Sequence, residues 1–191
     1  MKQLILASQS PQRRKLLRFL GLRFTVKPSR VAELHKIKTS CSALVKENAL
    51  RKAIEVASRV KKGVVIGADT LVYADKKIIG KPRNFKEARQ ILKVLFSQPR
   101  WVYTGIAVID VATAKTLVDY EKTKIFMVPL SDREIAQYHR RINPFDKAGG
   151  FQIEGWGSIF IHRIEGCYSN VIGLPMAKLA GMLKKVGVSI L

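Results

Sequence analysis

The sequence predicts an α/β or α+β domain, because short apolar runs typical of strands alternate with amphipathic stretches of helical spacing. Its 191 residues are 47% hydrophobic and 26% charged, as in globular proteins, and no repeat or low-complexity segment divides them. No apolar run approaches the roughly 18 residues that a membrane-spanning helix needs. We therefore expect one chain-long unit, in one or two lobes, with a sizeable core.

The first half of the chain predicts two strands and two helices. Leu4 to Ala7 is apolar and indicates a buried strand, which a polar turn separates from a helix over Gln12 to Leu20. From Ser42 to Val60 apolar residues keep helical spacing, and Gly63 is expected to close this helix. Val64 to Ala68 is again wholly apolar and indicates the second buried strand.

The second half predicts three helices and three strands. Asn84 with Glu87, and Ser131 with Glu134, have the spacing of a capped helix start, and Pro175 suits a first helical turn. The expected helices run from Asn84 to Phe96, from Ser131 to Ile142 and from Pro175 to Val186. The expected strands are Trp101 to Val111, Thr116 to Val128, and Ser158 to Ile164. The first two are expected to form an antiparallel pair joined by a turn near 112–115.

The charge balance is unusual. Thirty-five lysines and arginines against fourteen acidic residues leave a formal net charge of +21, which favours anionic partners such as nucleic acid, an anionic membrane or a phosphate-bearing small molecule. The basic residues are scattered along the chain and form no run of five or six, so a flexible nucleic-acid-binding arm is disfavoured. The alternative is that the organism's proteins are generally rich in surface lysine, which would give the same excess of positive charge without any anionic partner.

The compartment is expected to be the cytoplasm. Cys41 and Cys167 are the only cysteines, too few for a disulfide framework or a zinc site of their own. The apolar stretch near the N-terminus is too short for the core of a signal peptide, so we expect neither export nor a membrane partner.

The segment from Ala7 to Leu17 is the first candidate site. A strand ends in a polar turn, Pro11 suits the first position of a helix, and Arg13 follows. The N–H groups and positive dipole end of such a helix suit phosphate, Ser8 adds a hydroxyl, and the guanidinium can grip phosphate oxygens in pairs. An ordinary capped helix with exposed basic residues would show the same pattern.

Asp69 and Lys81 form the second candidate. Asp69 ends the apolar strand at Val64 to Ala68, where a carboxylate can hold a divalent metal or take a proton from water. Lys81 lies between Gly80 and Pro82, so a stiff turn directs its ammonium. The alternatives are an aspartate that only forms a turn and a lysine that only faces solvent. Glu33 and Lys52 are weaker candidates. They could equally be an ordinary loop glutamate and a solvent-facing lysine on a helix.

A glycine-rich stretch from Asp146 to Pro175 is the third candidate. Paired glycines, an isolated Glu154 before Gly155, and the turn from Asn170 onwards indicate close approach of the backbone to a ligand. Tight turns between strands would give the same pattern.

Seven ordered segments, which together span nearly the whole chain, resemble the Maf family of nucleoside triphosphate pyrophosphatases. They are SQSPQRRKLL (Ser8 to Leu17), ENALRKA (Glu47 to Ala53), IGADTLV (Ile66 to Val72), GKPRNFKEA (Gly80 to Ala88), TGIAVI (Thr104 to Ile109), DKAGGFQIEG (Asp146 to Gly155) and YSNVIGLP (Tyr168 to Pro175).

The resemblance implies an elongated mixed-sheet α/β fold related to the inosine triphosphate pyrophosphatases, with two lobes around a central cleft in a single domain over residues 1–191. It implies hydrolysis of a nucleoside triphosphate to the monophosphate and pyrophosphate, with Mg²⁺ or Mn²⁺ as cofactor. By position, Asp69 matches the catalytic aspartate, and the matching polar cleft residues are Ser8, Arg13, Glu33, Lys52 and Lys81. Asp69 and Glu33 would hold the metal, while Ser8, Arg13, Lys52 and Lys81 would bind substrate. Lys147 would either be a further cleft residue or only brace the glycine turn.

Three positions are expected to select the base: Gln12, Thr70 and Glu154. Family members that prefer dTTP and UTP typically have Arg and Gln where this chain has Gln12 and Glu154. Members that resemble the 7-methyl-GTP hydrolases have a glutamate at the position of Glu154, but usually a tryptophan at that of Gln12. An ionised carboxylate accepts hydrogen bonds only, so Glu154 suits the N–H edge of guanine and favours a relaxed or purine-tolerant specificity. The YSNVIGLP segment looks more like the dTTP/UTP branch.

A binding protein is the rival class. It would be a basic module on nucleic acid, or a cell-division regulator whose pyrophosphatase cleft has decayed. Because every charged cleft residue is present and no nucleic-acid-binding motif is visible, we favour the enzyme, with nucleic acid not its main partner. The oligomeric state stays open, a homodimer being one option.

Overall fold

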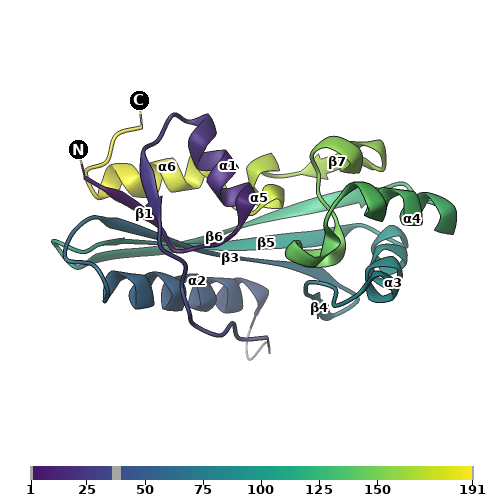
Figure 1. The fold of residues 1–191 in the computed structure, drawn as a ribbon, viewed down its shortest axis with the longest axis horizontal. Coiled ribbons are helices and arrows are strands. Elements are labelled where there is room, and N and C mark those ends of the chain that lie inside the picture. Colours follow the sequence, from purple (N-terminus) through teal and green to yellow (C-terminus); the bar gives the residue numbers. More distant parts are fainter. Residues whose placement is uncertain (1, 36–39, 191) are drawn as a thin grey trace. The chain divides into compact units, whose positions relative to one another are not determined.

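The computed structural model describes residues 2–35 and 40–190, and within them the chain forms a mixed sheet with helices, as the α/β prediction required. The sheet has seven strands in the described residues: six follow the order β2-β1-β3-β5-β6-β7, and the seventh, β4, pairs with β3 (Figure 1). The strands are β1 (Leu4–Leu6), β2 (Phe24–Val26), β3 (Val64–Ala74), β4 (Lys77–Ile79), β5 (Arg100–Asp110), β6 (Lys115–Met127) and β7 (Ile161–Glu165). The helices are α1 (Pro11–Phe19), α2 (Cys41–Ala57), α3 (Phe85–Phe96), α4 (Asp132–Arg141), α5 (Tyr168–Ile172) and α6 (Met176–Lys185).

The chain divides into two compact units. Unit 1 comprises residues 1–69, 104–121 and 173–191, and unit 2 comprises residues 70–103 and 122–172. The long strands β3, β5 and β6 each contribute residues to both units. None of the helices in the described ranges is long and apolar enough to cross a membrane.

Unit 1 is built on parallel strands. Leu4 to Leu6 of β1 pair in parallel with Phe24 to Val26 of β2 on one side and with Val64 to Ile66 of β3 on the other. Alternate residues of the strands pack against α2 through a buried apolar cluster. That cluster comprises Ile5, Ala7, Ala49, Ala53, Val56, Val65, Ala107 and Ile109.

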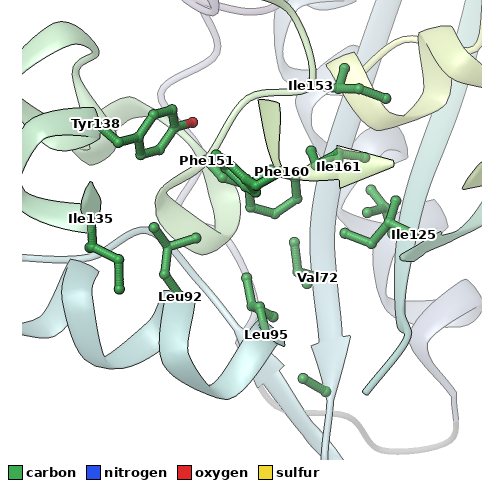
Figure 2. Packing of buried hydrophobic residues seen from close by; sticks show 12 residues of the cluster. Val72, Leu92, Leu95, Ile125, Ile135, Tyr138, Phe151, Ile153, Phe160 and Ile161 are labelled. Atoms are coloured by element: carbon green, nitrogen blue, oxygen red, sulfur yellow. The ribbon is translucent and has the colours of Figure 1, made fainter. Parts of the chain in front are cut away.

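Unit 2 has its own core, shown in Figure 2. Side chains of β3, β5 and β6 meet those of α3, α4 and the glycine-rich stretch in one buried cluster, with Phe160 fully buried among them. The Tyr138 and Phe160 rings meet edge to face with centroids 4.9 Å apart, a favoured aromatic geometry. The Tyr138 hydroxyl accepts a hydrogen bond from the Gln152 backbone N–H at 3.0 Å, so this core also holds the glycine-rich stretch.

The capping signals are confirmed. Ser10 precedes α1, whose first residue is Pro11, and the Asn84 side chain accepts from the Glu87 N–H at the start of α3. Ser131 and Glu134 form the reciprocal capping box of α4. Local side-chain chemistry therefore determines where these helices begin.

Other boundaries were predicted wrongly. The strand expected at Val64 to Ala68 continues to Ala74, where antiparallel pairing with β4 extends it, so Asp69 lies within β3 rather than at its end. The last strand begins at Ile161 rather than Ser158, because residues from Gly155 to Ile159 form a 3-10 helix. The long helix ends at Ala57 rather than Val60. The sequence reading had also missed β2, β4 and α5.

Candidate functional site

Asp69 is the buried carboxylate around which unit 1 gathers polar side chains. It lies on β3 three residues beyond Ile66, the last residue paired with β1, and only 6% of its surface is exposed. Its Oδ1 accepts a hydrogen bond from Lys52 Nζ at 2.7 Å, and its Oδ2 accepts one from Asn48 Nδ2 at 3.0 Å. Both donors come from α2, so one helix face holds both carboxylate oxygens.

Lys52 links two carboxylates. Its ammonium lies 2.6 Å from Glu33 Oε1 as well as 2.7 Å from Asp69 Oδ1. Glu33 lies in the loop before α2 and its side chain is 40% exposed, whereas the side chains of Lys52 and Asp69 are nearly buried. The structure therefore brings these three predicted residues together, with the more accessible carboxylate on the loop.

Asn48 is a site residue that the sequence reading missed. Besides the bond to Asp69, its amide donates to the Leu34 carbonyl at 3.0 Å and accepts from the Leu34 N–H at 2.9 Å. It thereby fastens the loop that carries Glu33. A signal was present, because Asn48 precedes Lys52 by four residues and so shares its helix face.

The turn before α1 positions Arg13. The Ser10 side chain caps the helix by accepting from the Arg13 N–H, and the Ser8 hydroxyl accepts from the Ser10 N–H at 3.2 Å. The Arg13 guanidinium donates to Ser8 Oγ at 3.0 Å and, through Nε, to the carbonyl of Gly173 at 2.8 Å. The second partner, Gly173, precedes α6 and was not predicted.

The electrostatics tie Arg13 to the two carboxylates. Burial lowers the pKa of the Arg13 guanidinium, and the negative charges of Asp69 and Glu33 act against that shift. A guanidinium keeps its charge even so, because its ordinary pKa lies far above neutral pH. Unit 1 thus concentrates two cations and two anions, with Ser8 bonded to one of the cations and with little exposed surface except at Glu33.

Lys81 belongs to unit 2 and is exposed. It follows β4, and the preceding Gly80 carbonyl accepts from the Gly149 N–H at 2.9 Å, which fastens this turn to the glycine-rich stretch. Lys147 donates to the Asn143 carbonyl at 2.9 Å and pairs with Asp146, so it braces the glycine turn.

The three positions expected to select the base lie in different units. Gln12 is half-buried on α1 in unit 1, where its Oε1 accepts from the Ser10 hydroxyl at 3.1 Å. Thr70 follows Asp69 on β3 but is the first residue of unit 2. Glu154, also in unit 2, is half-buried beside a groove of about 340 Å³ whose wall includes Tyr168 and Arg163.

The carboxylates suit a hard divalent cation. Among the described residues there is no cluster of three or more His, Cys, Asp or Glu side chains that could hold a metal alone. Mg²⁺, however, is commonly bound through one or two carboxylates together with substrate phosphates. Asp69 and Glu33 offer two carboxylates held by one lysine, so the donor set fits such an ion when substrate supplies the remaining oxygens.

Comparison with known proteins identifies relatives that share most of the length of this chain. The dTTP/UTP pyrophosphatase of Pelotomaculum thermopropionicum is 42% identical over 191 residues, which is all of both chains. That of Alkaliphilus oremlandii is 45% identical over 185 residues, 96% of each chain. A dITP/XTP pyrophosphatase structure from Mycobacterium abscessus covers 95% of this chain and 93% of its own at 15% identity, but its TM-score of 0.46 is too low to bear on the fold. The family model described as Maf-like protein matches residues 3–186, and the chain therefore belongs to the Maf family.

Proposed function

We propose that this protein hydrolyses nucleoside triphosphates to nucleoside monophosphates and pyrophosphate. The observation that carries the proposal is the Asp69–Lys52–Glu33 cluster, buried except at Glu33, which lies with Arg13 and Ser8 in unit 1. Relatives that are 42–45% identical over nearly their whole length are dTTP/UTP pyrophosphatases, which supports the same reaction class here. The activity belongs to the chain as one domain over residues 1–191.

Arg13, Ser8, Lys52 and Lys81 bind the triphosphate in this proposal. Cleavage between the α- and β-phosphates increases the charge on the departing pyrophosphate, so positive groups that are already positioned stabilise the transition state. Arg13 is oriented for this by its bonds to Ser8 and to the Gly173 carbonyl. Lys81 supplies a further cation from the turn at Gly80, which is fastened to Gly149.

Asp69 takes the proton of the attacking water. The water oxygen forms a bond to the α-phosphorus, the bond from that phosphorus to the bridging oxygen breaks, and pyrophosphate leaves with the electron pair. Lys52 and Asn48 hold the carboxylate in one orientation during this step.

Asp69 and Glu33 would hold Mg²⁺ or Mn²⁺ together with the phosphate oxygens. When bound, the cation supplies positive charge to those oxygens and makes water a better nucleophile. Glu33 suits this role because its side chain is the accessible member of the cluster.

Two preferences for the nucleobase of the substrate are candidates. The names of the relatives favour dTTP and UTP. The second candidate is hydrolysis of purine nucleotides as well. An ionised Glu154 can only accept hydrogen bonds, and so matches the N–H donors of a guanine edge. A comparison of kcat/KM for dTTP, UTP, GTP and 7-methyl-GTP in wild type and Glu154→Gln separates them. Pyrimidine preference that survives the substitution unchanged rejects Glu154 as the selecting residue.

The reaction class is tested by measuring pyrophosphate release. Purified protein is mixed with each standard nucleoside triphosphate and with modified ones, with Mg²⁺, with Mn²⁺ or with a chelator. We expect monophosphate and pyrophosphate in equal amounts, and loss of turnover with the chelator. Release of orthophosphate would contradict the proposal, because it means cleavage at the terminal phosphate. No turnover with any nucleotide would also contradict it, and would favour the decayed division regulator.

We place this activity in the cytoplasm, as a house-cleaning reaction that removes non-standard or modified nucleotides. Cys41 and Cys167 are both free thiols in the structure, which is consistent with a reducing compartment.

A further inference from the structure

Gly173 has a backbone conformation that other residues rarely adopt. It belongs to unit 1, and its φ of +118° lies in the left-handed region, where an L side chain is strained. Because φ is the rotation about the N–Cα bond, this angle sets the direction in which Gly173 presents its own carbonyl group. Glycine at this position therefore determines where one backbone acceptor points.

That acceptor meets the guanidinium of Arg13. The Gly173 carbonyl oxygen accepts a hydrogen bond from Arg13 Nε at 2.8 Å, and Ser8 Oγ accepts a second one from Arg13 Nη1 at 3.0 Å. Since a guanidinium is rigid and planar, two anchored nitrogen atoms fix the plane of the group. Gly173 thus supplies one of two anchors for Arg13 from 160 positions further along the chain.

Both of these anchors are uncharged. A carboxylate in place of the Gly173 carbonyl could also hold the guanidinium, but its negative charge would cancel part of the field that attracts a phosphate. The carbonyl orients the guanidinium by a hydrogen bond and leaves the net positive charge of Arg13 in place. A cation that is both oriented and uncancelled is what electrostatic stabilisation of a triphosphate requires.

The residues that follow Gly173 leave its carbonyl little freedom to move. Leu174 is fully buried, and Pro175 is the N-cap residue of α6, with a φ of −70°. A residue that precedes proline is itself restricted to extended conformations. A side chain at position 173 could therefore not be accommodated by a shift of the next two residues, and the strain would act on the angle that directs the carbonyl.

We propose that Gly173 is a positioning residue of the phosphate-binding site, which acts on the substrate through Arg13. Its positive φ directs the carbonyl to Arg13 Nε, and this bond holds the guanidinium in the orientation that binds the triphosphate. The inference rests on the proposed function, in which Arg13 binds the triphosphate. It requires that the effect of Gly173 on catalysis passes through one side chain.

The first test is a double-mutant cycle on kcat/KM. Gly173→Ala should lower kcat/KM at least about tenfold, because a hydrogen bond to a charged group loses its geometry. In the Arg13→Ala background the same substitution should change kcat/KM by less than about twofold, since the group on which it acts is absent. Equal losses in the two backgrounds would show that Gly173 supports the fold rather than Arg13, and would overturn the proposal.

Gly187→Ala is the matched control. Gly187 follows α6 in unit 1, has a φ of +74°, and an added Cβ would meet Lys2 Nζ only at 3.7 Å. The substitution introduces strain of the same kind at the opposite end of α6 from Gly173. We expect a lower free energy of unfolding, with kcat/KM within about twofold of the wild type. A loss of kcat/KM equal to that of Gly173→Ala would mean that backbone strain alone is responsible, which also overturns the proposal.

The second test uses the wild type, so it does not depend on whether Gly173→Ala folds. In protein that is isotope-labelled at arginine nitrogen and glycine carbonyl carbon, NMR should detect a scalar coupling across the hydrogen bond from Arg13 Nε to the Gly173 carbonyl. The coupling should persist when α,β-methylene-dTTP binds with Mg²⁺.

The outcomes separate the inference from the proposed function. Absence of the coupling in the free protein, or its loss when the analogue binds, would mean that Gly173 does not hold Arg13 on the triphosphate, and would overturn the inference. Absence of turnover with every nucleotide, while the coupling is intact, would instead reject the proposed function.

Discussion

The ammonium of Lys52 pairs with two carboxylates, which stabilises a charge cluster that is buried at Lys52 and Asp69 and open to solvent at Glu33. Burying an ion pair costs desolvation energy that Coulomb attraction returns only if the remaining polar atoms are also hydrogen-bonded. Here the second oxygen of Asp69 is bonded to Asn48, and Lys52 also approaches the Ala68 carbonyl at 3.4 Å. The cluster is therefore held in one geometry before substrate arrives, as electrostatic catalysis requires.

Asp69→Asn should abolish turnover while the protein stays folded. Asparagine keeps the volume and leaves Lys52 its bond to Glu33, but it lacks the charge needed to take a proton or to bind a cation. We expect pyrophosphate release to fall by at least about 10²-fold.

A urea unfolding curve of the same variant is the control, and should show a cooperative transition. Near-wild-type pyrophosphate release by the folded variant would remove Asp69 from the mechanism.

Arg13→Ala should weaken catalysis on every nucleotide by a similar factor, because a guanidinium at this position is expected to contact phosphate rather than base. Loss of a charge-assisted hydrogen bond costs about 1.5–3 kcal/mol. The measurement is kcat/KM for a pyrimidine and a purine triphosphate in parallel.

Arg13→Lys is the matched variant, since it keeps the charge but loses the planar fork that reaches both Ser8 and Gly173. It should recover only part of the loss. A changed order of base preference with an unchanged best rate would assign Arg13 to the nucleobase instead.

The placement of α2 decides where Lys52 and Asn48 lie, and two strand glycines allow that placement. A Cβ on Gly67 of β3 would collide with the Ala49 carbonyl oxygen and lie 2.9 Å from the Ala53 Cβ. A Cβ on Gly105 of β5 would collide with the backbone at Val45 in the same way. The close approach of helix to sheet brings Lys52 within reach of Asp69.

Gly67→Ala should therefore destabilise the protein and reduce its activity together. Overpacking of this kind costs about 1–3 kcal/mol, and the shift of α2 would lengthen the bond from Lys52 to Asp69. The free energy of unfolding and pyrophosphate release are both measured.

Gly181→Ala is the matched control, because Gly181 lies within α6 and an added Cβ would meet nothing within 4 Å. It should stabilise the protein by about 0.5–1 kcal/mol, since alanine is the better helix former, and leave activity unchanged. Two variants with the same stability would show that α2 does not depend on the glycine contact.

At the scale of the molecule, the net charge of +21 should speed the capture of an anionic nucleotide. We expect kcat/KM to fall about tenfold or more as salt rises from low to high concentration, and kcat to fall much less, because screening acts mainly on association. A parallel unfolding curve at each salt concentration excludes loss of the folded state. A kcat/KM that does not depend on salt would show that the net positive charge does not help the protein to bind its nucleotide substrate.

Local chemistry was readable in the sequence because its interactions span only a few residues. The caps at Asn84 and Ser131 were predicted correctly, since each depends on a side chain that bonds to an N–H three residues later. The 3-10 helix before β7 was missed. It depends on Gly157, where a Cβ would collide with the Gln152 carbonyl oxygen, a contact that no propensity reports.

The sequence by itself determined the α/β class, the family and the residue types of the candidate site, because strand and helix periodicity and ordered motifs are properties of the chain. Only the tertiary structure decided that Lys52 joins Asp69 to Glu33, that Asn48 fastens the loop of Glu33, and that Arg13 bonds to Gly173. These contacts join residues 14–160 positions apart, and their formation depends on helix packing against the sheet. Sequence spacing cannot show such contacts. Those of Lys52 and Asn48 arise only when the glycines of β3 and β5 allow α2 to approach closely.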